Sequence, residues 1–346
     1  MESVVDFWKG KKVLVTGHTG FKGCWLSIWL HKLGANVRGF SLKEYPNEIM
    51  FKDCGMGYRM KDIRGDINNL EELGKVFDSV DIVFHLAAQS LVRKSYYNPL
   101  ETLKTNIIGT ANVLECIRNS DTKAGVIVTS DKCYENKNTN YSYNETDPLG
   151  GIDPYSCSKG CAELVVKSWN DSFLKDKKIA TARAGNVIGG GDWAEDRLIP
   201  DCVKALEKNK AIEIRNPSFT RPWQHVLEPL SGYLLLGQKL LEGENFEGAW
   251  NFGPNMDSNL KVQAVVKMFI DKWGSGDWKD ISEETDNLHE SKLLSLDISK
   301  ANSMLGWKPK LNIEDAVYLT SGWYKNYKNK DPYELTIAQI EEYEKK

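Results

Sequence analysis

The chain has 346 residues, in which 45 lysines and arginines face 48 aspartates and glutamates, so its formal net charge at pH 7 is −3. Hydrophobic residues make up 41% and charged residues 27%, a composition that is typical of a soluble globular protein and excludes intrinsic disorder, collagen and a small disulfide scaffold. Because no long run of like charge occurs, we expect no nucleic-acid partner, and about 150 residues per domain predicts roughly two domains.

The first half of the chain alternates apolar strand-like runs with segments of helical spacing. Strands are predicted over residues 12–16, 36–40, 81–86, 125–130 and 179–183, with one more just before Gly65. Helices are predicted through residues 25–30, 70–77, 102–117 and 154–175. This alternation predicts an α/β fold, a doubly wound parallel sheet (Rossmann) that is covered by helices on both faces.

The pattern changes after Asn186, where glycines and prolines interrupt short segments. A helix at 230–241 and a strand at 249–252 resemble the first half, whereas the helices near 262–273 and 313–324 suggest a smaller, discontinuous C-terminal substrate lobe. The predicted domains are a nucleotide-binding domain (1–185 plus about 226–256), the substrate lobe (about 186–225 plus 257–330) and a charged C-terminal tail (331–346), which is expected to form a surface helix.

A glycine motif lies between the first predicted strand and the first predicted helix. Glycine lets the backbone turn tightly and approach a pyrophosphate at a helix N-terminus, so this placement predicts a dinucleotide site formed by Gly17, Thr19, Gly20, Phe21, Lys22 and Gly23. Further cofactor contacts are expected from Asp66, Ile67, Leu86, Ala87, Ala88 and Gln89. Asp66 equally suits a helix N-cap. Gln89 and Ser90 suit the lining of a sugar pocket, although the run from Ala87 to Gln89 equally suits packing against the cofactor.

The second predicted strand ends without the acidic residue that would hold the ribose of NAD. Ser41 occupies that place and Glu44 follows slightly late, whereas Arg38 and Lys43 would suit the 2′-phosphate of NADP. These residues leave the choice between NAD and NADP open.

A second group of residues is typical of redox chemistry on a hydroxyl group. Tyr155 and Lys159 are four residues apart on a predicted helix, so they share one face. We expect Lys159 and an oxidised nicotinamide to lower the pKa of Tyr155, so that its phenolate takes a hydroxyl proton. Ser130 ends a predicted strand and suits the same substrate oxygen, while Asp131 and Lys132 add an acid and a base that a simple alcohol dehydrogenase would not need.

The cysteines and the ends of the chain bear on the compartment. Seven cysteines form no C-x-x-C motif, and no ligand pair at zinc spacing accompanies Cys157 and Cys161, so free thiols and no metal site are predicted. The N-terminus lacks the features of a signal peptide, and no apolar run is long enough to span a membrane. We therefore expect a cytoplasmic protein without a membrane partner.

Several longer runs carry a family resemblance that covers about residues 7–327. They are TGHTGFKG at 16–23, HLAAQSLVR at 85–93, TSDKCY at 129–134, DPYSCSKGCAE at 153–163, RAGNVIGGGDWAEDRLIPD at 183–201 and RPWQHVLEP at 221–229. Together they resemble the extended short-chain dehydrogenase/reductase (NAD-dependent epimerase/dehydratase) family, and more narrowly its CDP-glucose 4,6-dehydratases. TSDKCY and GNVIGGGDWAEDRLIPD are far more specific than the glycine motif.

The resemblance implies a hydro-lyase that dehydrates CDP-D-glucose to CDP-4-keto-6-deoxy-D-glucose with tightly held NAD. Tyr155 and Lys159 would oxidise C4, and Asp131 would protonate the departing C6 hydroxyl. Lys132 stands where the related dTDP-glucose enzymes have a glutamate base. It would act as the C5 base, for which its pKa must fall from about 10.4 to roughly 7–8, or as a cation that stabilises the enolate; both roles stay open.

The resemblance also implies a nucleotide-sugar substrate that is bound by Ser90, Ser130, Asn186, Arg197, Leu198 and Arg221. Arginine suits a pyrophosphate because its planar fork forms two hydrogen bonds, although an inter-lobe salt bridge is the alternative for each arginine. His225 and His289 are expected to be structural. A homodimer or dimer of dimers that pairs helices 102–117 and 154–175, and a place in deoxy-sugar biosynthesis such as that of lipopolysaccharide O-antigen, are further implications.

Two alternative functions remain beside this one. Another nucleotide-sugar 4,6-dehydratase or a 4-epimerase would use the same scaffold, but an epimerase has no use for an acid at Asp131. A catalytically silent NAD(P)-sensing protein is disfavoured because Ser130, Tyr155 and Lys159 are all present.

Overall fold

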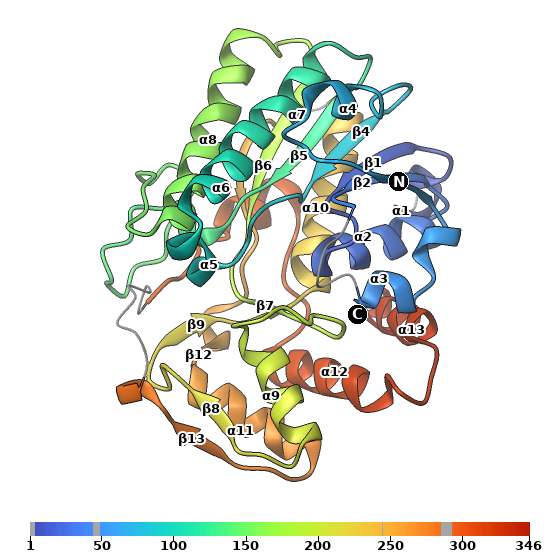
Figure 1. Cartoon of the computed structure of the whole chain (residues 1–346). Coiled ribbons are helices and arrows are strands. Elements are labelled where there is room, and N and C mark those ends of the chain that lie inside the picture. Colours follow the sequence, from blue (N-terminus) through green and yellow to red (C-terminus); the bar gives the residue numbers. More distant parts are fainter. Residues whose placement is uncertain (1–3, 44–48, 244, 285–292) are drawn as a thin grey trace.

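The computed structural model describes residues 4–43, 49–243, 245–284 and 293–346. At its centre lies a seven-stranded sheet in the order β11-β6-β5-β4-β1-β2-β3, in which each neighbouring pair is parallel (Figure 1). The strands are β1 (Lys12–Thr16), β2 (Asn36–Ser41), β3 (Lys61–Arg64), β4 (Ile82–His85), β5 (Ala124–Val128), β6 (Lys178–Arg183) and β11 (Gly248–Asn251).

Helices cover both faces of this sheet because its strands are apolar on both sides. In β1, Val13 and Val15 belong to one hydrophobic core, and Leu14 between them belongs to the other. The first core is closed by α1 (Val4–Trp8), α2 (Phe21–Lys32) and α10 (Leu227–Leu241), and the second by α4 (Leu70–Gly74), α7 (Gly109–Arg118) and α8 (Pro154–Ser172). The predicted doubly wound α/β fold is confirmed.

A smaller group of elements lies below the carboxyl edge of the sheet in Figure 1. The chain leaves the sheet after β6, forms α9 (Leu198–Glu207), and returns through α10 to β11. Three two-stranded pairs belong here: β7 (Val187–Ile188) with β10 (Gln224–His225), β9 (Thr220–Pro222) with β12 (Asn259–Lys261), and β8 (Ile212–Ile214) with β13 (Trp278–Asp280). The helices α11 (Val262–Trp273) and α12 (Ile313–Asn326) complete it.

Some predicted boundaries differ from the structure. The predicted helix 102–117 is divided into α6 (Pro99–Leu103), a π-helical turn over Lys104–Ile108, and α7. The predicted helix 70–77 ends at Gly74. Short helices that were not predicted are α3 (Ile49–Asp53) and α5 (Val92–Tyr97), and the turn Asp131–Cys133 is 3₁₀-helical.

The predicted C-terminal surface helix is present as α13 (Pro332–Lys345), but one of its faces is buried. Ile340 and Tyr343 are buried in the first core, and the helix packs against α2. The hydroxyl of Tyr343 donates to Glu228 Oε2 at 2.8 Å, which gives a buried carboxyl of α10 a partner. The helix therefore covers the outer side of α2, which itself packs on the sheet.

No helix within the described residues is both long and apolar enough to cross a membrane. All seven cysteines lie in the described ranges and are free thiols, as predicted.

Candidate active site

A cavity of about 820 Å³ opens at the carboxyl ends of β1, β4, β5 and β6. Its walls come from the glycine turn after β1, the segments that follow β4 and β5, the start of α8, and the loops of the smaller lobe. Ligands of open parallel α/β sheets bind at this edge. The structure thus brings the two predicted groups of residues, the glycine motif and the Tyr155–Lys159 pair, into one cavity.

The glycine turn leaves space that only glycine provides. Gly17 has a φ of +72°, and a Cβ there would lie 2.6 Å from Ala87 N. A Cβ at Gly23 would lie 2.1 Å from the carbonyl oxygen of Gly17, which requires α2 to approach the turn closely. A Cβ at Gly20 would meet only this same oxygen, at 3.4 Å, so Gly20 faces the open cavity and fits the backbone approach of a pyrophosphate.

The end of β2 bears on the choice of dinucleotide. Ser41 is buried, lines the cavity, and shares a 2.6 Å hydrogen bond with the hydroxyl of Thr19. Arg38 donates from Nη1 to the carbonyls of Val76 and Asp78, at 2.7 and 2.9 Å, so the hypothesis that it meets a 2′-phosphate was wrong. Lys43 is exposed and does not belong to the cavity lining. Glu44 lies outside the described residues.

The segment after β3 contributes Asp66 and Ile67 to the cavity. Asp66 Oδ1 accepts the backbone N–H of Asn68 at 2.9 Å. The N-cap of α4 is instead Asn69, whose side chain accepts the N–H of Glu72 at 3.2 Å, so the alternative role of Asp66 as an N-cap was wrong.

Most residues of the segment after β4 line the cavity, but one of them is used to hold the turn in place. Leu86, Ala87, Ala88 and Ser90 line the cavity, but Gln89 does not. Its side-chain amide donates to Leu91 O at 3.0 Å and to Thr102 Oγ1 at 2.9 Å, so its polar atoms are used to fix the turn. The interpretation of Gln89 as a cofactor or sugar contact is therefore corrected.

Tyr155 and Lys159 lie on the first two turns of α8, which starts at an N-cap formed by Asp153. Both line the cavity, and their side chains are almost completely buried. Lys159 Nζ donates to Val128 O at 3.3 Å, and burial lowers its pKa to about 8 while the charge of Glu163 opposes this change.

The expected lowering of the Tyr155 pKa by Lys159 is not found. Burial, which disfavours the phenolate, raises the pKa of Tyr155 to about 12, although a hydrogen bond with Ser130 acts in the opposite direction. Desolvation dominates because the tyrosine lies deep in the cavity wall.

Ser130, Asp131 and Lys132 follow β5 and all line the cavity. Ser130 Oγ donates to Asp131 Oδ1 at 2.9 Å and accepts the backbone N–H of Lys132 at 3.2 Å. Asp131 is buried, and burial raises the pKa of its carboxyl above the usual value. A carboxyl that keeps its proton more readily is suited to general acid catalysis.

Lys22 lies near enough to Asp131 and Lys159 for their charges to act on it, which its place in the glycine motif did not suggest. Burial lowers its pKa to about 7, the positive charges of Arg197 and Lys159 lower it further, and the carboxylate of Asp131 opposes them. Lys22 therefore belongs electrostatically to the redox end of the cavity, which the spacing of the glycine motif could not reveal.

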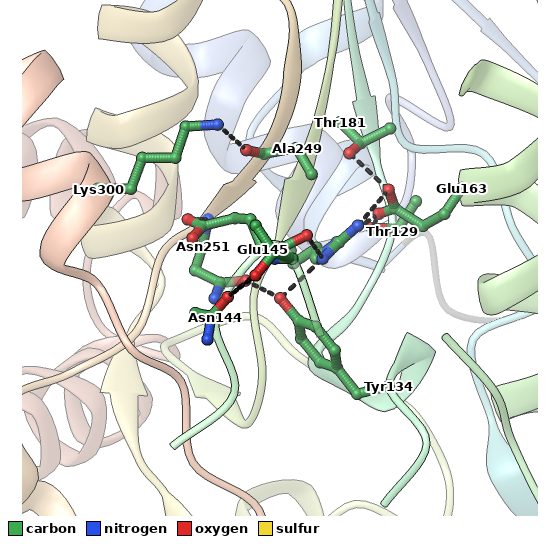
Figure 2. A network of polar contacts seen from close by, with 11 residues as sticks. Thr129, Tyr134, Asn144, Glu145, Glu163, Thr181, Ala249, Asn251 and Lys300 are labelled. Atoms are coloured by element: carbon green, nitrogen blue, oxygen red, sulfur yellow. Dashed lines mark hydrogen bonds and ion pairs between the residues drawn. The ribbon is translucent and has the colours of Figure 1, made fainter. Parts of the chain in front are cut away.

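Behind the cavity wall, a buried ion pair connects α8 to the sheet (Figure 2). Arg183 Nε and Nη2 donate to the two carboxylate oxygens of Glu163 at 3.0 and 2.9 Å, and both side chains are at most 4% exposed. The hydroxyls of Thr129 and Thr181 also donate to Glu163, at 2.5 and 2.7 Å. Glu163 follows Lys159 by one helical turn, so this network fixes the helix that carries Lys159.

The same arginine reaches the segment that carries Asp131. Arg183 Nη1 donates to Tyr134 Oη at 2.7 Å, and Tyr134 donates in turn to Asn251 Oδ1 at 2.7 Å. Asn251 N donates to Glu145 Oε1 at 2.8 Å. The network in Figure 2 therefore joins the ends of β5, β6 and β11 to the segment that holds Asp131 and Tyr134.

Besides Ser130, the other predicted substrate residues also line the cavity: Ser90, Asn186, Arg197, Leu198 and Arg221. Arg197 donates to Ser90 Oγ at 3.0 Å and pairs with Asp192 at 2.9 Å, so it also forms the salt bridge that was the alternative interpretation. Two further cavity residues, Arg93 and Arg215, were not predicted. The closeness of Arg215 to Arg221 in one proline-containing segment was a signal that could have identified it.

His225 is structural, as predicted. It is fully buried, its ring meets that of Trp25 edge to face at 5.8 Å, and burial lowers its pKa to about 3. His289 lies outside the described residues. In the described ranges, no three His, Cys, Asp or Glu side chains are grouped in a way that could hold a metal ion.

The known proteins to which this chain is similar include 4,6-dehydratases and 4-epimerases of nucleotide sugars. A family model described as GDP-mannose 4,6 dehydratase matches residues 14–320. A CDP-glucose 4,6-dehydratase of Salmonella typhimurium is 45% identical over 331 residues, which is 92% of each chain. A dTDP-D-glucose 4,6-dehydratase of Dictyostelium discoideum is 27% identical and covers 92% of this chain and 82% of its own.

Solved structures of the same fold cover nearly the whole chain. A dTDP-glucose 4,6-dehydratase of Streptomyces venezuelae, with NAD bound, has a TM-score of 0.79 at 23% identity and covers 93% of this chain and 99% of its own. A UDP-glucose 4-epimerase of Thermotoga maritima, with UDP-glucose, has a TM-score of 0.79 at 22% identity and covers 92% of this chain and 100% of its own. These two support the fold.

Proposed function

The chain belongs to the nucleotide-sugar dehydratase family whose model is described as GDP-mannose 4,6 dehydratase, and we propose that within it this protein is an NAD-dependent CDP-glucose 4,6-dehydratase. The proposed reaction converts CDP-D-glucose to CDP-4-keto-6-deoxy-D-glucose. It consists of oxidation at C4, loss of water across C5 and C6, and reduction at C6. The observation that carries the proposal is the presence of a redox pair and an acid–lysine pair in one cavity, supported by the 45% identical relative.

NAD is the proposed cofactor, and the cavity fits it. The glycine turn, Asp66 and Ile67, and Leu86 to Ala88 would hold the dinucleotide, and Ser41 in place of a cation at the end of β2 favours NAD over NADP. When bound, NAD supplies the acceptor for the hydride of C4 and the donor that returns it to C6. Arg38 supports this choice as well, because its guanidinium group donates to two backbone carbonyls and is not directed at the place of a 2′-phosphate.

Tyr155 is the proposed base for the C4 hydroxyl. Its phenolate form takes the hydroxyl proton, and Ser130 hydrogen-bonds the same substrate oxygen. Because burial keeps the pKa of Tyr155 at about 12 in this chain, the positive charge of Lys159 and the oxidised cofactor must together favour the phenolate when substrate is bound. Lys159, whose pKa is about 8, is mostly charged at neutral pH.

Asp131 and Lys132 are the proposed dehydration pair. The carboxyl of Asp131, whose proton is retained more strongly because the group is buried, protonates the C6 hydroxyl as it leaves. Lys132 has one of two roles: it takes the C5 proton, which the neighbouring 4-ketone makes acidic, or it stabilises the enolate as a cation while another group takes that proton. Lys132→Met is expected to stop dehydration and leave C4 oxidation intact. Elimination at an unchanged rate in this variant would refute the role of Lys132.

The substrate's pyrophosphate is assigned to three arginines that line the cavity. Arg197, Arg215 and Arg221 line the cavity, and guanidinium groups suit a diphosphate because they offer paired donors. Ser90, Asn186 and Leu198 would contact the rest of the nucleotide sugar. A small anionic substrate can therefore bind although the net charge of the whole chain is −3.

The alternatives fit the cavity less well. A 4-epimerase would use Tyr155 and Lys159 but not an acid at Asp131, whose buried carboxyl faces the same cavity. A catalytically silent NAD(P)-sensing protein would have no need for Ser130, Tyr155 and Lys159 together. Another 4,6-dehydratase, specific for a different nucleotide, is the strongest rival.

The division into two lobes is part of the proposal. Residues 1–185 with about 226–256 form the dinucleotide-binding domain, and about 186–225 with 257–330 form the nucleotide-sugar lobe; α13 packs on the first of these. Free thiols are consistent with the proposed cytoplasmic location, and the product class suits deoxy-sugar biosynthesis such as that of O-antigen.

A homodimer, or a dimer of dimers, is the proposed assembly. Leu100 on α6, Ile108 on the π-helical turn and Leu164 on α8 are 79%, 51% and 56% exposed, and their elements pack against one another. Exposed aliphatic side chains gathered on adjacent helices are typical of a surface that is covered by a partner.

The function is tested by offering the purified protein CDP-glucose, dTDP-glucose and GDP-mannose in parallel. A 4-keto-6-deoxy product from CDP-glucose, formed much faster than from the other two, is the expected result. Product from another nucleotide sugar alone would overturn the substrate assignment, and a 4-epimer without dehydration would overturn the reaction.

A further inference from the structure

Gly185 lies immediately behind the carboxyl group of Asp131. It is buried and lines the cavity just after β6, within the run RAGN. A Cβ at Gly185 would lie 1.8 Å from Asp131 Oδ2, 2.4 Å from its Cγ and 3.0 Å from its Oδ1. The carboxyl group therefore occupies the volume that the side chain of any other residue would need.

The backbone of Gly185 is held in place, so it cannot retreat from this contact. The side chain of Gln224, which is 2% exposed, donates from Nε2 to the carbonyls of Gly185 and Phe252, both at 3.0 Å. Gln224 N also donates to the carbonyl of Asn186 at 3.2 Å. On the other side, Arg183 is fixed by its two hydrogen bonds to Glu163.

The carboxyl of Asp131 is itself held from one side only. Its Oδ1 accepts from Ser130 Oγ at 2.9 Å, whereas its buried Oδ2 has no hydrogen-bond partner among the described residues. Oδ2 can occupy its position because Gly185 has no side chain, since a Cβ there would lie 1.8 Å from this oxygen. A buried polar oxygen without a partner is unusual and points to a functional use.

We propose that Gly185 is a positioning residue for dehydration, because its missing side chain forms the slot that holds the carboxyl of Asp131 in the cavity. The proposal rests on the function proposed above, in which Asp131 is the acid that protonates the C6 hydroxyl. A side chain at position 185 would displace this carboxyl, while Tyr155 and Lys159, on α8, keep their places. Elimination across C5–C6 would then become slow, whereas oxidation at C4 would continue.

The kinetic test compares Gly185→Ala with the wild type on CDP-glucose and NAD. We expect reduced nicotinamide to form on mixing and to accumulate, while the 4-keto-6-deoxy product falls by about 10²-fold or more, the usual contribution of a general acid. Asp131→Asn, which keeps the size of the side chain, should likewise accumulate reduced nicotinamide and form little product. Product formation within roughly threefold of the wild type, or an equal loss of oxidation and dehydration, would overturn the proposal.

A stability test checks the packing independently of any activity. Gly185→Ala is expected to lower Tm by about 2–4 °C through overpacking, and Asp131→Ser in the same chain should recover most of this loss because the smaller side chain vacates the slot. Gly125→Ala is the matched control: its Cβ would meet only the side chains of Ile179 and Ile117 closely, at 3.1 and 3.2 Å.

Any loss of Tm in the Gly125→Ala control should not be recovered by Asp131→Ser, and its product formation should not separate from C4 oxidation. If Gly185→Ala does not fold and the double variant does not fold either, the slot is refuted. If the wild type makes no keto sugar from CDP-glucose, the proposed function fails, whereas the thermal comparison still decides whether Gly185 and Asp131 share this space.

Discussion

Replacing Arg183 by methionine is expected to destabilise the protein strongly, because the change leaves the carboxylate of Glu163 buried without its counter-charge. Glu163 is about 3% exposed and would keep only its hydrogen bonds from Thr129 and Thr181. Breaking a buried ion pair in this way costs about 3–5 kcal/mol of unfolding free energy. With about 2.1 cal/mol/K of unfolding entropy per residue, a chain of 346 residues should lose about 4–7 °C in Tm.

A double-mutant cycle followed by circular dichroism tests this reasoning. Arg183→Met, Glu163→Leu and the double variant are compared, and the double variant should lose at least about 2 kcal/mol less than the sum of the single losses, since it leaves no unpaired charge. Lys75→Met is the control, because Lys75 pairs with Glu71 on an exposed helix surface, and Tm should not change measurably. Single losses that add within about 0.5 kcal/mol would refute the coupling.

Three further predictions follow from the cavity and from the exposed helices. The rate at saturating substrate should fall as pH rises through about 8, where Lys159 loses its proton. Glu163→Gln should move this fall to lower pH, because it removes the negative charge that raises the pKa of Lys159. Thr181→Val keeps this carboxylate and should not move the fall. Asp131→Asn should reduce product by about 10²–10⁴-fold while C4 oxidation, followed as reduced nicotinamide, continues; equal losses of both would contradict this. Leu164→Glu should convert the proposed dimer to monomers, as measured by light scattering, and an unchanged mass would exclude this surface.

Features that depend on local periodicity were accessible from the sequence. The apolar run at 12–16 stops at a glycine, and β1 has these same bounds. The spacing of Tyr155 and Lys159 within one helix also required only the helical repeat. The parallel sheet also followed from the alternation of strands with helices, whereas the order of its strands came only from the structure.

Features that depend on long-range contact were not accessible. Glu163 and Arg183 are 20 residues apart on different elements, and no spacing rule pairs them. Gly185 meets the carboxyl of Asp131 only because β5 and β6 are neighbours in the sheet, and the helical spacing in 102–117 gave no sign of the π-helical turn. Gln89 was misassigned for a related reason: it lies in the segment after β4, whereas its hydrogen-bond partner Thr102 belongs to α6.

The most direct measurement of the central claim follows one hydrogen atom through the reaction. CDP-glucose labelled with deuterium at C4 is incubated with the purified protein and NAD, and the product is examined by NMR and mass spectrometry. If one active site performs C4 oxidation, dehydration and C6 reduction, the deuterium is recovered at C6 of a 4-keto-6-deoxy sugar. Deuterium that remains at C4 of an epimer, or that is lost to water, would contradict the account.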